Sequence, residues 1–229
     1  YKSLLQRLDF KKPKKTMKIE NFLKTHWFPL FLLLTRSLFG ADDFESRNTI
    51  SYGFKLPYSI KLDCKQSLRL SGKEQSFKQT FTELTFKYEI IDDLSVIIPI
   101  RYAIFDDKVK SRITFGGVYK IGMKPIKIRF KTRFQSTHEK DKDPDELYRN
   151  KIYAHYRLNK KFEPFFTYEV FHPADSNNNS LNEYRFSLGT DFDLPRKRSL
   201  KLYYLFKVED LNKKSPDKAH IMGLTFSLN

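Results

Sequence analysis

The segment Ile126-Lys-Ile-Arg-Phe-Lys-Thr-Arg-Phe-Gln135 alternates between two sets of side chains, one of Ile, Phe and Thr and one of Lys and Arg. Successive side chains of a β-strand point to opposite faces, so this alternation predicts a strand with one apolar face and one cationic face. A helix would distribute the same cations around its whole circumference. The segment therefore indicates a sheet in which both faces carry a defined chemistry.

The same two-faced pattern returns along most of the chain after residue 47. Eleven runs follow it: 50–56, 58–70, 82–90, 94–104, 109–119, 126–135, 152–158, 162–172, 184–194, 200–208 and 220–228. Runs of about 9–13 residues suit tilted membrane strands better than the shorter strands of soluble sheets. We therefore expect an all-β fold, an up-and-down antiparallel transmembrane β-barrel of 10–12 strands.

The expected number of strands follows from a rule of bacterial barrels, which have an even number in a single chain. Twelve strands are preferred here, with an additional strand near 41–47 restoring even parity. Short and longer connections mostly alternate, as periplasmic turns and external loops do. Pro99 removes a backbone donor, so a bulge or a local break in pairing is expected there.

The N-terminal part of the chain reads as a leader. Residues 1–16 are basic and show no strand pattern, which indicates a non-native or upstream extension. Met17 opens a segment with lysines, the short apolar run Trp27-Phe-Pro-Leu-Phe-Leu-Leu-Leu34 and small residues at its end, so 17–41 is predicted to be a secretory signal peptide. A membrane-anchoring or interfacial helix is the alternative. Residues 42–229 would then form one barrel domain.

Charge and cysteine content narrow the function classes. The net charge is +16, but residues 1–41 account for +7 of it, and the remaining cations alternate with acids along strands. No nucleic-acid-binding motif accompanies this charge, so a nucleic-acid partner is not expected. Cys64 is the only cysteine of the sequence, which excludes an intramolecular disulfide and a thiolate metal cluster. Its parity places it among apolar residues, as a small hydrophobic side chain.

Alternation alone does not separate a membrane barrel from a soluble one that carries a lipid, because both show the same period. Three features favour the outer membrane of a bacterial cell, with lipid as a partner. The first is the predicted signal peptide, and the second is the set of aromatic residues near the run ends, as in interfacial girdles. Those rings are Tyr52, Tyr88, Tyr102, Tyr119, Phe134, Tyr156, Phe192 and Tyr204. The third is the final run Gly223-Leu-Thr-Phe-Ser-Leu228, which resembles the terminal strand by which such barrels reach the assembly machinery. A soluble secreted or periplasmic lipid-binding barrel stays the alternative.

Several aromatic and charged patterns resemble a known family. They are Glu163-Pro-Phe-Phe-Thr-Tyr-Glu169 with Phe171, Glu183-Tyr-Arg185 before Leu188-Gly189, Leu202-Tyr-Tyr204 and Arg129-Phe-Lys-Thr-Arg-Phe134. Over about residues 44–228 the chain is similar to the barrel family called domain of unknown function 2490. The resemblance implies an outer-membrane barrel with no assigned activity, and it transfers no catalytic residue.

If the apolar faces contact lipid, the other faces line the lumen, where charge is tolerated. A basic wall is then predicted from Lys127, Arg129, Lys131, Arg133, His155 and Arg157. An acidic wall is predicted from Glu163, Glu169, Glu183 and Asp191. The two walls would give either a narrow channel for small solutes or ions, with a preference for anions, or a structural barrel filled by salt bridges.

No catalytic constellation is visible in the sequence, so we do not expect an enzyme. The nucleophile-elbow, zinc-protease, P-loop and dinucleotide-binding motifs are all missing. The histidines are not spaced as metal ligands, and neither a metal nor another cofactor is predicted. A membrane-embedded acyl hydrolase that assembles Ser and His from distant strands, with His155 or His220 as the base, is the remaining alternative.

Overall fold

The computed structural model describes residues 44–72, 74–174 and 181–228, and the regular structure in this part of the chain is β-strand. The predicted extension 1–16 and signal peptide 17–41 lie outside the described residues. The strands are β1 (Phe44–Lys55), β2 (Ile60–Ser71), β3 (Ser76–Ile91), β4 (Leu94–Phe105), β5 (Val109–Met123), β6 (Ile126–Glu139), β7 (Asp145–Tyr156), β8 (Phe162–Pro173), β9 (Glu183–Leu194), β10 (Arg198–Glu209) and β11 (Asp217–Leu228). No helix among the described residues is long and apolar enough to cross a membrane.

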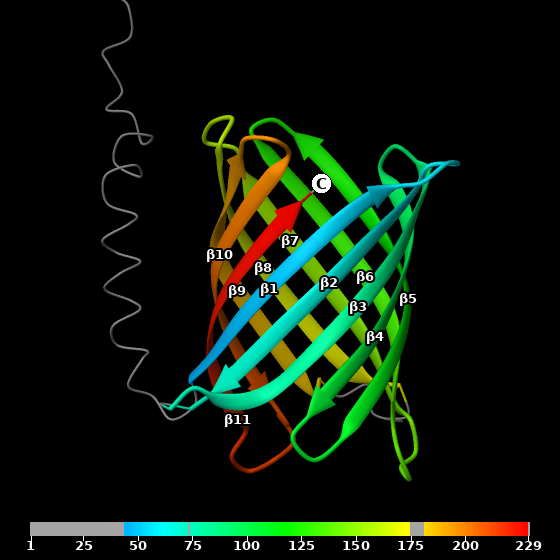
Figure 1. The fold of residues 1–229 in the computed structure, drawn as a ribbon, viewed down its shortest axis with the longest axis vertical. Helices are drawn as coiled ribbons and strands as arrows, with labels where there is room; N and C mark the ends of the chain where they lie inside the picture. Colours follow the sequence, from blue (N-terminus) through cyan, green and yellow to red (C-terminus); the bar gives the residue numbers. More distant parts are fainter. Residues whose placement is uncertain (1–43, 73, 175–180, 229) are drawn as a thin grey trace, which may run out of the picture. The chain divides into compact units, whose positions relative to one another are not determined.

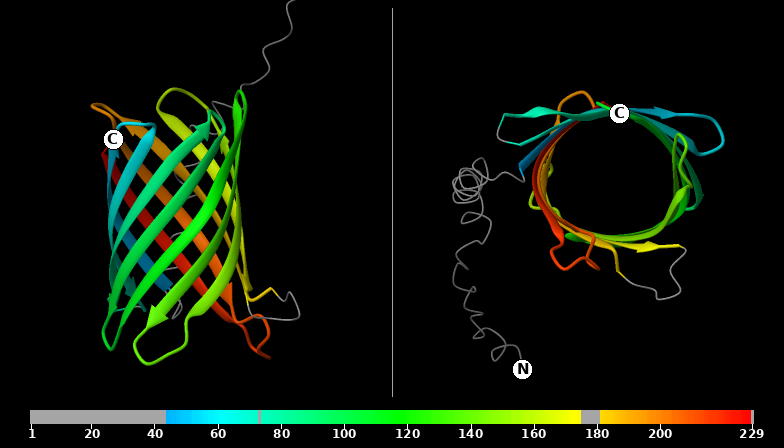
Figure 2. Two further views of the ribbon diagram at one scale, coloured as in Figure 1. Left: turned by 90° about the vertical axis from the view of Figure 1, so that its right-hand side faces the viewer. Right: turned by 90° about the horizontal axis from the view of Figure 1, so that it is seen from below.

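Strands that follow one another in the chain pair antiparallel, and β1 and β11 close the barrel (Figure 1). The closing pair is parallel, and its register runs from Phe44 opposite His220 to Tyr52 opposite Leu228. Seen from one end, the strands form a closed ring (Figure 2). The all-β, up-and-down barrel predicted from the alternation is confirmed.

The described residues form eleven strands, so the preferred number of twelve is wrong. Residues 44–47, in which an additional strand was expected, are the beginning of β1. An odd number of up-and-down strands leaves the first and the last running in the same direction, and for this reason β1 pairs with β11 in parallel rather than antiparallel.

The outer face of the barrel is apolar. Large exposed side chains project from strands all around it, among them Ile50, Leu84, Ile100, Phe115, Ile152 and Leu188. Ile50 is 61% exposed and Phe115 is 59% exposed. Such apolar exposure is unfavourable in water but favourable in contact with lipid chains. A soluble barrel that carries a lipid needs these faces to point inward. They point outward, so the geometry does not fit that alternative.

The inner face holds the opposite set of side chains. Polar and charged residues that alternate with the outer ones are buried, among them Thr85, Ser95, Thr114, Gln135, Arg149 and Glu169. Two aromatic residues of β8 also lie on this face, since Phe165 and Phe171 alternate with the exposed Phe166 and Tyr168. The two-faced pattern of the sequence is therefore the inside and outside of the barrel.

Two departures from regular pairing are local. The register shifts between Arg69 and Leu70 in the β2–β3 pair and near Glu89 in the β3–β4 pair. At Pro99 the expected local break occurs without a bulge: the β4–β5 pairing is interrupted between Ile97 and Ile100, but the register is the same on both sides. The missing amide hydrogen of proline accounts for the interruption.

The two ends of the barrel differ. One end carries the connections after the odd-numbered strands, such as the two-residue turns at 92–93 and 124–125. The other carries the longest connections, 174–182 and 210–216, together with the start of β1. We call these the short-turn end and the long-loop end; Figure 1 shows the C-terminus at the short-turn end.

The ring of Tyr203 on β10 lies in the lumen against glycine backbone. A Cβ placed on Gly223 of β11 would lie 2.0–2.4 Å from ring atoms and the hydroxyl of Tyr203, and one on Gly189 of β9 would lie 2.7 Å from the Cβ of Tyr203. Only glycine leaves room for this ring between the neighbouring strands.

Candidate functional site

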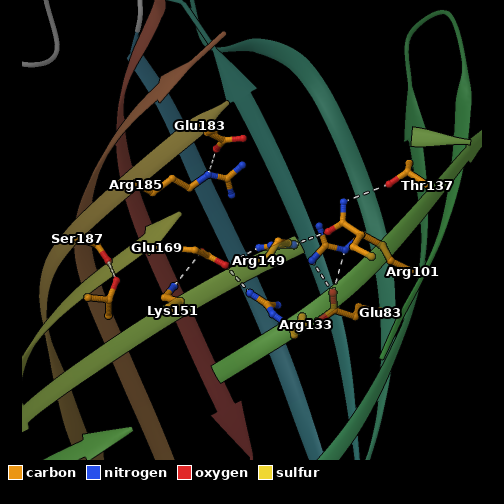
Figure 3. Close-up of polar contacts among 12 residues, drawn as sticks. Glu83, Arg101, Arg133, Thr137, Arg149, Lys151, Glu169, Glu183, Arg185 and Ser187 are labelled. Atoms are coloured by element: carbon orange, nitrogen blue, oxygen red, sulfur yellow. Dashed lines mark hydrogen bonds and ion pairs between the residues drawn. The ribbon is translucent and has the colours of Figure 1, made fainter. Parts of the chain in front are cut away.

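The cationic side chains of β6 point into the lumen, where two of them contact carboxylates of β8. Lys127 Nζ lies 3.2 Å from Glu163, and Arg133 pairs with Glu169 (Figure 3). Arg157 follows β7 in the connection to β8, and its Nε lies 3.3 Å from Glu163. Basic and acidic residues of the predicted walls thus meet across β7, which lies between β6 and β8.

His155 on β7 brings a second group of predicted residues together. Its Nδ1 lies 3.2 Å from Glu163 and 3.8 Å from Asp191, and its Nε2 lies 3.2 Å from Arg129 Nη2. The Arg129 guanidinium lies 4.5 Å over the ring of Tyr153, which stacks on His155. This cluster lies near the short-turn end, beside a cavity of about 360 Å³.

Glu169 is the most heavily paired acid of the predicted set. Its side chain is 3% exposed, and it accepts hydrogen bonds from Arg133 and from Arg149, the latter at 2.8 Å. Lys151 Nζ lies 3.4 Å from its other oxygen. Figure 3 shows the carboxylate between these three cations, which come from β6 and β7.

The remaining two predicted acids are paired as well. Glu183 accepts a hydrogen bond from Arg185 two residues along β9, and Asp191 lies 3.3 Å from Lys201 of β10. Every carboxylate of the predicted acidic wall therefore contacts at least one cation.

The cations nevertheless outnumber the acids in the middle of the lumen. A cavity of about 390 Å³ there, called the central cavity below, is lined by ten Lys or Arg side chains and by two carboxylates, Glu83 and Glu169. A second cavity of about 290 Å³ lies towards the long-loop end and is lined by nine Lys or Arg and three acids. Lys131 lines the central cavity and forms no ion pair among the described residues. Both cavities are strongly electropositive.

Five arginines line both cavities: Arg47, Arg69, Arg101, Arg149 and Arg185. None of the five was predicted from the sequence as a site residue. Alternation assigned Arg69, Arg101 and Arg185 to the polar faces of their strands, which was the available signal. Arg149 lay outside every predicted run, because β7 begins at Asp145 rather than at Ile152.

The long loops carry paired lysines. Lys142 Nζ lies 2.5 Å from Glu139, and this hydrogen bond raises the pKa of Lys142. Asp210 raises the pKa of Lys213 in the same way, across 2.5 Å. Both amines therefore stay charged at neutral pH.

The geometry gives little support to catalysis. His155 and His220 form no hydrogen bond with a serine in the part of the chain that the structure describes, and His220 bonds the hydroxyl of Tyr204 at 2.8 Å. Ser136 lies 3.3 Å from His138, but among the described residues no carboxylate pairs with His138 to orient it. No cluster of His, Cys, Asp and Glu in these residues could hold a metal ion.

The barrel is similar to several solved structures. A NanC porin shares 9% identity at a TM-score of 0.48, covering 71% of this chain and 84% of the porin. A KdgM porin shares 11% identity at a TM-score of 0.45, covering 69% and 80%. An anion-selective porin from Comamonas acidovorans shares 12% identity at a TM-score of 0.39, covering 76% and 54%. No curated protein matches the chain.

The sequence itself matches a family over residues 47–217, which is most of the barrel, from β1 to the beginning of β11. The family is described as Protein of unknown function (DUF2490), and the resemblance noted in the sequence is confirmed. The chain belongs to this family.

Proposed function

We propose that this protein is a narrow, anion-preferring channel in the outer membrane of a bacterial cell. The observation that carries the proposal is the central cavity, where ten cationic side chains meet two carboxylates inside a closed barrel. Charge within a narrow, low-dielectric wall acts over the whole width of the lumen. An excess of eight positive charges favours the entry of anions and disfavours cations.

The outer surface supports the membrane location. Exposed apolar side chains surround the barrel and would contact the lipid chains, and Tyr52, Tyr88, Tyr102, Tyr119 and Tyr156 are exposed where interfacial aromatic girdles are expected. We propose that segment 17–41 directs export and that the final strand, Gly223 to Leu228, is recognised by the barrel-assembly machinery. Because the strand charges face inward, no nucleic-acid partner is proposed.

The proposal is tested by recording currents from the full chain refolded into a planar lipid bilayer under a KCl gradient. We expect stable conductance with a reversal potential that shows preference for chloride. The double variant Lys131→Glu/Arg129→Glu should shift the reversal potential towards cation preference, because it reverses two lumenal charges that have no carboxylate partner among the described residues. Lys218→Glu, an exposed change near the long-loop end, is the control and should leave selectivity almost unchanged.

A barrel that inserts but carries no current would overturn the channel and favour a structural barrel filled by salt bridges. If the double variant still prefers chloride, the lumenal charge does not determine the selectivity, and this part of the proposal is wrong. Lipid hydrolysis by the refolded protein, lost on His155→Ala, would favour the acyl hydrolase instead.

A further inference from the structure

Cations lie directly opposite cations across neighbouring strands of the lumen. The register pairs Arg47 with Arg69, Arg101 with Arg112, Arg133 with Arg149, and Arg185 with Lys207. Like charges directly opposite each other destabilise a sheet. Four such pairs on β1/β2, β4/β5, β6/β7 and β9/β10 therefore carry a cost to folding that a mixed arrangement would avoid.

Six of these arginines gather in one place. Arg47, Arg69, Arg101, Arg112, Arg149 and Arg185 all line the cavity of about 290 Å³ near the long-loop end, and we call them the guanidinium cluster. They come from six different strands, so they approach the cavity from several sides. The cluster lies next to the central cavity, which five of its members also line.

Two phenyl rings form cation–π contacts with four of the guanidinium groups. The guanidinium carbons of Arg69 and Arg101 lie 5.0 Å and 4.0 Å from the ring centre of Phe81. A cation–π contact uses the face of a guanidinium and leaves the N–H donors in its plane free for hydrogen bonds.

Phe171 of β8 makes the same kind of contact with two other arginines. Arg149 lies 4.5 Å and Arg185 lies 4.4 Å from its ring centre. The rings fix the positions of the guanidinium groups, so less conformational entropy is lost when a ligand binds.

Part of the donor capacity of the cluster is unused. Arg69 and Arg112 form no ion pair with a carboxylate of the described residues. Their acceptors are neutral: Arg69 donates to the side-chain oxygen of Gln79, and Arg112 donates to the Thr137 hydroxyl at 3.0 Å. The Nε atoms of Arg47 and Arg149 are buried without a hydrogen-bond acceptor in the structure. A buried, unsatisfied N–H of a charged group is costly, and an oxyanion is the acceptor that suits it.

We propose that the guanidinium cluster binds small solutes that carry two or more oxyanion groups, phosphoryl or carboxylate. This inference rests on the proposed channel and names its solute class. Each oxyanion accepts paired N–H donors from one guanidinium fork, and a solute with several such groups bridges arginines on different strands. Such a solute therefore offsets the repulsion in several like-charged pairs at the same time. A monovalent anion offsets it in one pair only. The cavity volume restricts the solute to a small molecule.

The test is isothermal titration calorimetry on the full chain folded in detergent, with pyrophosphate, propane-1,2,3-tricarboxylate and acetate as ligands. We expect the two polyanions to bind at least about tenfold more tightly than acetate, with affinity falling as salt is raised. The polyanion that binds more tightly identifies phosphoryl or carboxylate as the preferred group, and either result supports the cluster.

The variant Arg69→Gln/Arg112→Gln removes two cations without leaving a carboxylate of the described residues unpaired. We expect it to fold, checked by the heat-dependent gel mobility of the barrel, and to weaken polyanion binding by about tenfold or more. The matched control Lys55→Gln/Lys124→Gln also removes two charges, near the short-turn end. It should change polyanion affinity by less than about twofold.

The outcomes separate this inference from the proposed channel. Chloride-selective current without preferential binding of polyanions overturns the cluster and leaves the channel in place. Tight polyanion binding to a barrel that carries no current overturns the channel and retains the site. Equal loss of affinity in the control variant overturns the inference, because binding then follows the total charge of the protein.

Discussion

Glu169 shows how one carboxylate organises the charges around it. Its side chain is 3% exposed and lies among Arg133, Arg149 and Lys151, which belong to strands β6 and β7. Without this acid, three buried cations would repel one another in a poorly solvated part of the lumen. Removing one partner of a buried ion pair costs about 3–5 kcal/mol, because the other charge is left uncompensated.

Glu169→Gln is therefore expected to destabilise the barrel by about 3 kcal/mol. The measurement is urea unfolding of the protein in lipid vesicles, followed by the mobility shift between folded and unfolded forms. Glu89→Gln is the matched control, since Glu89 pairs with Lys61 and Lys120 in a more solvated position and should change stability little. Equal stability of the Glu169→Gln variant and the parent protein would contradict this account.

Alternation predicted which face each charged residue of β6 and β8 occupies, including Arg133 and Glu169. It did not predict which cation meets which acid, because that depends on strand register and on the barrel's curvature. The like-charged pair of Arg47 and Arg69 is an example: nothing within either strand reveals that the two arginines lie opposite each other. Register is a relation between segments, and one sequence carries it only weakly.

Among the strands, Tyr203 connects β9, β10 and β11. Its ring occupies the space over Gly223, and its Cβ lies near the position that a Cβ on Gly189 would take. A shift of β11 by two residues would replace Gly223 with a residue that has a side chain, such as Ile221 or Thr225, and the ring would no longer fit. The contact therefore helps to fix the register of the last strand.

Gly223→Ala is expected to destabilise the barrel by about 1–3 kcal/mol, because the new methyl group meets the Tyr203 ring. Urea unfolding in vesicles measures the effect. In the double variant Gly223→Ala/Tyr203→Ala the clash is gone, so its loss of stability should be less than the sum of the two single losses. Gly117→Ala, where a Cβ has open space, is the control and should have little effect. If the loss of stability in the double variant equals the sum of the two single losses, the contact between Gly223 and Tyr203 does not contribute to stability.

The strands themselves were largely predictable, because an apolar outer face imposes its period on the sequence. The residues at which the strands begin and end were less predictable. β7 begins at Asp145, seven residues ahead of the predicted run 152–158, because the polar residues at its beginning still pair with β6. In β8, Phe165 and Phe171 blurred the pattern by lying inside the barrel, where Lys201 and Arg149 stack on them.

At the scale of the molecule, the odd number of strands is the feature that sequence reasoning missed. The chain shows eleven runs, but the even-number rule of bacterial barrels argued for a twelfth. Closure is a property of the whole sheet: the edges of β1 and β11 satisfy each other in parallel, and neither strand alone indicates this.

The difference between the two ends predicts an orientation. If the longer connections face outward, as in other outer-membrane barrels, Lys213 is extracellular and Asn159 is periplasmic. In a Cys64→Ser background, Lys213→Cys should react with a membrane-impermeant maleimide on intact cells. Asn159→Cys should react only after the outer membrane has been permeabilised. The reverse labelling pattern would show that the barrel has the opposite orientation.

The parallel pairing of β1 and β11 has a further consequence for the two ends of the barrel domain. β1 starts at the long-loop end and β11 finishes at the short-turn end, so peptide joined ahead of residue 44 and peptide joined after residue 228 leave on opposite sides of the membrane. In an even-stranded barrel both would leave on the same side. In the orientation expected here, a domain fused before β1 would be displayed on the cell surface, while one fused after β11 would stay in the periplasm.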